Sequence, residues 1–217
     1  MEEIDPQFLA QQLRKPEGEF GQKLAEELNK TNKHLTYFTY DSIDLKDGDK
    51  VLEIGFGNGK LVPSLLNRNN TISIFGIDFS KEMVQEAITY NEKHIQEGKM
   101  EFHVSGVSNI PYPDNYFDHI CTINTLYFWP NPSSDVKEII RVLKPGGTLH
   151  IGIRVKEEVQ NMPFIQFGFQ LYSTQEGCDL LKNGGFTTTY FNTKLDPEFE
   201  FQGQIHQIHS LVISGVK

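Results

Sequence analysis

Short apolar runs alternate with segments of helical spacing along most of the chain. The apolar runs predict strands at residues 50–54, 73–78, 101–104, 119–124 and 148–154. Helical spacing predicts helices over residues 20–45, 60–67, 81–97 and 132–143. This alternation is typical of a parallel sheet that helices cover on both faces.

The last third of the chain has a different pattern. Residues 174–182 predict a short helix that Gly184 and Gly185 end, and residues 186–191 and 208–216 predict two further strands. No repeat or low-complexity tract interrupts the pattern. A length of 217 residues fits one domain with a single substantial core.

Three glycines at alternate positions follow the first predicted strand, in the pattern E-x-G-x-G-x-G from Glu53 to Gly59. Glycines gather in such a turn when a ligand lies against bare backbone, and they tolerate positive φ angles. A dinucleotide fingerprint, G-x-G-x-x-G, needs its third glycine at position 60, where the chain has Lys60. The spacing therefore predicts a ligand site and argues against NAD.

A carboxylate ends the second predicted strand. Asp78 lies at a suitable distance beyond the glycines to accept hydrogen bonds from both hydroxyls of a ribose. Ser80 has the character of a helix N-cap, and Phe79 and Met83 are placed to enclose an adenine ring. These residues predict a nucleoside ligand.

Four blocks in this order resemble the class I S-adenosylmethionine-dependent methyltransferases: residues 53–59, Asp78, residues 110–118 and residues 141–147. The resemblance covers residues 49–153 well and the flanking segments more loosely. It implies a Rossmann-like, doubly wound α/β fold. The expected sheet has seven strands, mostly parallel, with an antiparallel last strand inserted beside the fifth and helices on both faces.

The resemblance also implies a cofactor, S-adenosylmethionine, with S-adenosylhomocysteine as its product. The residues that it places against the cofactor follow the ends of the strands: Glu53, Gly55, Phe56, Gly57, Gly59, Asp78, Phe79, Met83, Val107, Ser108, Asn124 and Thr125. Where the family often has an aspartate for the adenine amino group, this chain has Gly106. Backbone groups of Val107 and Ser108, and the Ser108 hydroxyl, are then left to face the ring.

Acceptor-binding candidates are Tyr37, Tyr40, Tyr127, Trp129 and Arg154. The aromatic loop 127–129 either lines an acceptor pocket or packs against a neighbouring helix. No single residue is indicated as a catalytic base, because a sulfonium methyl is already activated and its transfer requires mainly positioning.

Two regions are expected. Residues 1–45 form a helical cap segment and residues 46–217 the methyltransferase domain. The stretch 14–21 is interpreted either as a lid over the cofactor or as a leader before a covering helix, and the insert 159–172 is expected to close the other side of the site.

A net charge of −9 without a basic stripe argues against nucleic acid as a partner. Two isolated cysteines indicate neither a disulfide framework nor a metal site. The first residues carry no secretory signal and no apolar run reaches membrane-spanning length, so a cytoplasmic location is expected. The oligomeric state stays open.

The sequence thus predicts methyl transfer to a small-molecule acceptor by direct in-line displacement. The alternative is a cofactor-binding protein without activity that serves as a partner or regulatory subunit. Macromolecular methylation is disfavoured, because the N/D-P-P-Y/F tetrad of some N-methyltransferases is replaced by Asn124-Thr125-Leu126-Tyr127.

Overall fold

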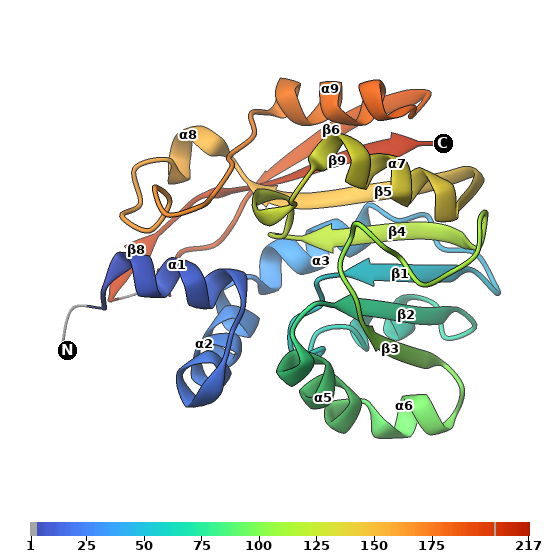
Figure 1. The fold of residues 1–217 in the computed structure, drawn as a ribbon, viewed down its shortest axis with the longest axis horizontal. Coiled ribbons are helices and arrows are strands. Elements are labelled where there is room, and N and C mark those ends of the chain that lie inside the picture. The colour runs from blue at the N-terminus through green and yellow to red at the C-terminus, as the bar shows by residue number, and fades with distance from the viewer. Residues whose placement is uncertain (1–3, 202) are drawn as a thin grey trace.

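The computed structural model describes residues 4–201 and 203–217, and it contains a seven-stranded sheet in the order β3-β2-β1-β4-β5-β9-β6 (Figure 1). The strands are β1 (Lys50–Ile54), β2 (Ser73–Asp78), β3 (Met100–Val104), β4 (Phe117–Ile123), β5 (Leu143–Arg154), β6 (Thr188–Leu195) and β9 (His209–Val216). Strands β1 to β5 pair in parallel, and β9 lies antiparallel between β5 and β6. The predicted fold, including its antiparallel last strand, is confirmed.

The helices lie around this sheet. They are α1 (Pro6–Arg14), α2 (Gly18–Thr31), α3 (Lys33–Asp41), α4 (Ser64–Arg68), α5 (Lys81–Tyr90), α6 (Glu92–Gln96), α7 (Pro132–Val142), α8 (Lys156–Val159) and α9 (Thr174–Gly184), with a 3₁₀ turn η1 (Leu126–Phe128). A small hairpin of β7 (Phe199–Phe201) and β8 (Gln204–His206) follows β6. No helix in the described ranges has the length and apolar character needed to cross a bilayer.

Both faces of the sheet are buried, and alternate side chains of a strand enter different cores. On β1, Val51 packs in one cluster with Ile43 and Leu65, whereas Leu52 packs in the other with Ile139 and Leu149. Helices α3, α4 and α5 supply the first cluster, and α7 and α9 supply the second. Burial on both sides explains why the parallel strands appear in the sequence as nearly continuous apolar runs.

Strand β1 lies between β2 and β4, so the chain reverses its direction of winding beside it. Ile54, the last residue of β1, is level with Ile77 of β2 and Thr122 of β4. The carboxyl ends of these strands therefore meet at one edge of the sheet, and α1 and α2 lie at that edge (Figure 1). In open α/β sheets this position forms the ligand crevice.

Several predicted helices are shorter than their hydrophobic patterns suggested. The segment 60–67 becomes helical only from Ser64, after Pro63. The segment 81–97 divides at Asn91, whose Nδ2 donates to the carbonyls of Gly59 at 3.1 Å and Ala87 at 2.9 Å. This side chain ties the helix end to the glycine loop, a tertiary contact that spacing cannot reveal.

The other differences concern boundaries and small elements. The segment 20–45 divides at Asn32 into α2 and α3, and the predicted strand 186–191 runs over 188–195. Helix α1 and the β7–β8 hairpin were not predicted. A start signal for α1 was nevertheless present, because Asp5 caps the helix by accepting from the Phe8 amide at 3.1 Å, with Pro6 at the first helical position.

Helix α3 approaches β5 closely because position 152 has no side chain. A Cβ atom on Gly152 would lie 2.1 Å from Thr39 Oγ1 and 3.3 Å from Leu35 Cδ1. Both neighbours belong to α3 and are buried. Gly152 therefore sets the distance between this helix and the sheet.

We expect Gly152→Ala to lower the free energy of unfolding by about 1–3 kcal/mol, because the added methyl overpacks this contact. Thr39→Ala in the same background removes the nearest atom and should recover part of the loss. Urea unfolding of the two single variants and the double variant measures the coupling. Additive effects would contradict this account of the contact.

Candidate active site

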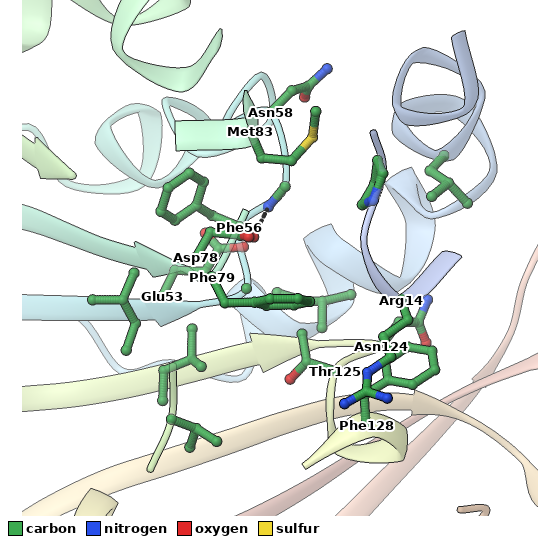
Figure 2. Close-up of a pocket in the computed structure, with 18 of the residues that line it drawn as sticks. Arg14, Glu53, Phe56, Asn58, Asp78, Phe79, Met83, Asn124, Thr125 and Phe128 are labelled. Carbon is green, nitrogen blue, oxygen red and sulfur yellow. Dashed lines mark hydrogen bonds between the residues drawn. The ribbon is translucent and has the colours of Figure 1, made fainter. Parts of the chain in front are cut away.

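A cavity of about 360 Å³ lies at the edge of the sheet where β1, β2 and β4 end. Five segments line it: residues 13–36 of the N-terminal helices, the loop 53–62, residues 77–83, residues 105–108 and residues 123–130. Figure 2 shows Glu53 and Asp78 at one end of this cavity and Asn124, Thr125 and Phe128 at the other. The site is therefore elongated and crosses the ends of the central strands.

The glycine loop forms the floor with left-handed backbone. Gly55, Gly57 and Gly59 have φ angles of 73°, 61° and 70°, which favour glycine at each position. A Cβ on Gly57 would meet nothing within 4 Å, so the backbone there faces open space. Phe56 packs on Phe102 beside the loop, with ring centroids 4.8 Å apart.

Gly59 differs from the other two glycines, because it does not line the cavity. A Cβ there would lie 2.6 Å from the Cβ of Ala87. Position 59 requires a glycine because the loop packs closely against α5 there. The predicted contact of Gly59 with the cofactor stays a prediction.

Asp78 ends β2 with its carboxylate against the loop. It is 7% exposed, and it accepts hydrogen bonds from the Gly57 amide at 3.0 Å and the Ser80 amide at 2.9 Å. Burial raises the pKa of Asp78 to about 6, although the two amides oppose the rise. Each oxygen retains a free lone pair for hydroxyl donors.

Glu53 lies beside Asp78 and is also buried. Burial raises its pKa to about 7; the hydrogen bond from Tyr40 opposes this rise and the charge of Asp78 adds to it. The Tyr40 hydroxyl donates to Glu53 Oε2 at 2.6 Å from within the core. Neither Tyr40 nor Tyr37 lines the cavity, and their predicted contact with an acceptor stays a prediction.

Phe79, Met83 and Val107 line the cavity beyond Asp78. Gly106 follows the end of β3, directly precedes Val107 and also lines the cavity. A Cβ on Gly106 would meet nothing within 4 Å, and its φ angle is not positive. Ser108 also lines the cavity, but its hydroxyl donates to Asp135 Oδ1 at 2.6 Å. The Ser108 oxygen still has lone pairs that can accept a hydrogen bond, so its predicted place against the adenine stays a prediction.

At the other end, Asn124 holds a positive φ of 55° directly after β4. Its Nδ2 donates to Asn32 Oδ1 at 3.0 Å, which connects the sheet to the N-terminal helices. Trp129 Nε1 donates to Thr125 Oγ1 at 3.0 Å, and both residues line the cavity. Trp129 thus combines the two roles that the sequence left open, packing and lining.

Asparagines of the N-terminal helices were missed in the sequence. Asn32 bonds to Asn124, and Asn29 Nδ2 donates to Asn58 Oδ1 at 3.1 Å. The spacing of Asn29 and Asn32 places them on one face of a helix, and this was the available signal. Their partners lie far away in the sequence, so the pairing itself depends on the tertiary structure.

Arg154 is held by the protein itself. Its guanidinium donates to Asp196 Oδ2 at 2.5 Å, to Ser210 Oγ at 3.2 Å and to the Thr31 carbonyl at 3.1 Å. Its backbone amide donates to the Tyr127 hydroxyl at 2.7 Å. Arg154 and Tyr127 line a smaller neighbouring cavity, and their predicted place in an acceptor site stays a prediction.

Comparison with known proteins gives the family. A methyltransferase-domain model matches residues 52–151. The putative methyltransferase YrhH of Bacillus subtilis is 30% identical over 144 residues, which cover 66% of this chain and 79% of that protein. The chain belongs to the class I S-adenosylmethionine-dependent methyltransferases.

Two further similarities extend the comparison. The 27-O-demethylrifamycin SV methyltransferase of Amycolatopsis mediterranei is 29% identical over 125 residues, covering 58% of this chain and 46% of that enzyme. A chain of the complex between the Haloferax volcanii Trm112 methyltransferase activator and the putative methyltransferase has a TM-score of 0.77 at 20% identity, with coverage of 100% and 99%. The last likeness concerns the fold.

The cavity of this methyltransferase fits the cofactor of its family. The backbone at Gly57 and Gly106 leaves room where side chains would otherwise stand. Asp78 offers carboxylate oxygens that accept hydrogen bonds. Among the predicted cofactor-binding residues, all except Gly59 line the cavity. Their individual contacts with S-adenosylmethionine stay predictions.

We expect Asp196→Ala to lower the free energy of unfolding by about 3–5 kcal/mol, because it leaves the buried guanidinium of Arg154 without its counter-charge. Thermal or urea unfolding measures the loss. Asp179→Ala, on an exposed position of α9, serves as the control. Equal stability of the two variants would show that the Arg154–Asp196 pair is dispensable.

We expect the contribution of Glu53 to stability to fall as the pH rises from 4.5 to 7, because native Glu53 keeps its proton above its ordinary pKa of 4.5 while the unfolded chain loses it. In Glu53→Gln this decline should be smaller by up to about 3 kcal/mol. Asp78 contributes in the same direction between pH 3.8 and about 6 in both proteins. Urea unfolding at several pH values tests this, and identical slopes would contradict a raised pKa at Glu53.

Proposed function

We propose that this methyltransferase transfers a methyl group to a small-molecule acceptor by direct in-line displacement. Bound S-adenosylmethionine would supply the electrophilic methyl group and leave as S-adenosylhomocysteine. The protein would bind the two molecules in line and exclude water from them. The similarity to the rifamycin methyltransferase supports an acceptor of this class.

The observation that carries this proposal is the wall that the N-terminal helices build over the site. Leu13, Arg14, Leu28 and Asn32 line the same cavity as the glycine loop. A molecule that reaches the methionine end of the cofactor must therefore fit between the cap and the sheet. Such a covered site favours a small acceptor over a nucleic acid or a protein surface.

We propose that residues 1–45 act as a cap over residues 46–217; residues 1–3 and 202 lie outside the described residues. Polar contacts near the glycine loop and α5 join the cap to the domain. Lys60 Nζ donates to Glu26 Oε2 at 2.7 Å, the Gly18 amide donates to Glu82 Oε2 at 2.9 Å, and Asn29 contacts Asn58. The Lys60–Glu26 pair is exposed and therefore weak, whereas the buried Arg154–Thr31 and Tyr40–Glu53 contacts hold the later part of the cap against the sheet.

We assign no side chain as a strong base that removes the proton of the acceptor. Burial raises the pKa of Tyr127 to about 12, so its phenol stays protonated at neutral pH. Glu53 is bonded to Tyr40, and Asp78 lies at the opposite end of the cavity from Asn124. The acceptor would then lose its proton to water after or during transfer, rather than to a dedicated side chain.

The second candidate function is cofactor binding without transfer, as a partner or regulatory subunit. The neighbour from Haloferax volcanii, in a complex with a methyltransferase activator, supports considering a requirement for a partner. Binding of cofactor together with an absence of transfer to any small acceptor would favour this candidate. A cytoplasmic location and an absence of nucleic-acid binding stay predictions.

We expect calorimetric titration to show micromolar binding of S-adenosylmethionine and S-adenosylhomocysteine and no binding of NAD. Gly106→Val should abolish that binding, because its side chain fills open cavity without backbone strain or a clash. Its urea midpoint should equal that of the wild type. Binding of NAD alone, or normal cofactor binding by Gly106→Val, would contradict the proposed site.

A further inference from the structure

A second cavity of about 120 Å³ adjoins the first on the side of β5. The two cavities share five lining residues: Leu13, Leu28, Asn32, Asn124 and Phe128. Of these, Asn124 and Phe128 lie at the end of the main cavity that is remote from Asp78 (Figure 2). The second cavity therefore opens from the part of the site where an acceptor would meet the methyl group, if the proposed function is correct.

Aromatic side chains, together with aliphatic ones, line this second cavity. The aromatic ones come from segments distant in the sequence: Tyr127, Phe128, Phe164, Phe169, Phe199 and Phe201. Phe169 packs on Phe128 at a centroid distance of 4.6 Å and on Phe164 at 5.6 Å. Such a lining favours an aromatic guest, since tilted and edge-to-face ring contacts add to the burial of apolar surface.

The lining has no charge left for an ionised guest. Arg154 is the charged residue of the lining, and its guanidinium is paired with Asp196 and bonded to Ser210. The Tyr127 hydroxyl accepts from the Arg154 amide and donates to Asn124 Oδ1 at 3.4 Å. An ion in this cavity would lose its hydration without compensation, so the guest is uncharged.

The size of the cavity limits the guest to about one ring. An engineered apolar cavity of about 150 Å³ in another protein binds benzene, and the second cavity here is slightly smaller at about 120 Å³. A fused two-ring group would not fit without movement of the lining. A short alkyl chain would fit but would not use the ring contacts.

The junction between the cavities offers neutral polar groups. Asn32 and Asn124 are the polar residues that line both cavities, and their carboxamides bond to each other at 3.0 Å. Carboxamides donate and accept hydrogen bonds without charge. They suit a hydroxyl or amino group that projects from the ring toward the main cavity.

We propose that the second cavity binds a single uncharged aromatic ring, and that the acceptor of this methyltransferase is a phenol- or aniline-like molecule whose hydroxyl or amino group lies at Asn32 and Asn124. This inference rests on the proposed function. It adds the chemical class of the acceptor and assigns the aromatic lining as the determinant of specificity.

The test uses phenol as the probe and the protein saturated with S-adenosylhomocysteine, so that binding is measured without turnover. Calorimetry should detect phenol binding to the wild type. Val159→Phe extends a buried side chain into the second cavity. The new ring should clash with bound phenol and weaken phenol binding at least about tenfold. Its affinity for S-adenosylhomocysteine should be unchanged, since Val159 does not line the main cavity.

A matched pair of variants in one loop tests the size limit. Phe164→Ala enlarges the second cavity and should allow binding of 1-naphthol, which the wild type rejects. Phe167→Ala removes a ring from the same loop outside both cavities and should behave as the wild type. This pair keeps the test valid if Val159→Phe fails to fold.

The outcomes separate this inference from the proposed function. If S-adenosylhomocysteine binds but phenol does not, or if phenol binds equally to all folded variants, the aromatic-acceptor inference is wrong and the methyltransferase proposal stands. Equal binding of 1-naphthol by Phe164→Ala and Phe167→Ala would also overturn the inference. If S-adenosylhomocysteine does not bind, both fail.

Discussion

Parallel pairing of β1 with both β2 and β4 is the constraint on which the site depends. Parallel strands end at the same edge, so the loop after Ile54, the carboxylate of Asp78 and the turn at Asn124 come together there. Their separation along the chain is irrelevant once the strands are paired. Because helices bury both faces of the sheet, this edge is where polar and backbone groups can meet a ligand.

A second connection holds the other half of the site. The guanidinium of Arg154 joins the end of β5 to Asp196 after β6, to Ser210 on β9 and to the end of α2 at Thr31. One buried cation thereby fixes the cap, the antiparallel strand and the aromatic cavity in relation to one another. A buried ion pair costs desolvation, and here its hydrogen bonds satisfy groups from separate segments.

The two cavities divide the chemistry of the site between them. The larger one contains two buried carboxylates with raised pKa values and exposes backbone at the glycines. The smaller one is aromatic, and its charge is already paired. They meet at two carboxamides that bond to each other, and Arg14 lines the larger cavity at the same end. This arrangement favours positioning over acid–base chemistry.

The sequence by itself determined the order of strands and helices, the glycine loop and the acidic residue after β2, because these depend on local periodicity and on glycine backbone. It also placed the predicted cofactor-binding residues, except Gly59, at the main cavity, since strand ends can be read directly. Tertiary structure alone decided that Gly59 serves packing against Ala87, that Tyr40 is buried on Glu53 and that Arg154 is paired with Asp196. It also decided the division of the helix at Asn91 and the aromatic cavity. Those features arise from contacts between segments distant in the chain, which no local pattern encodes.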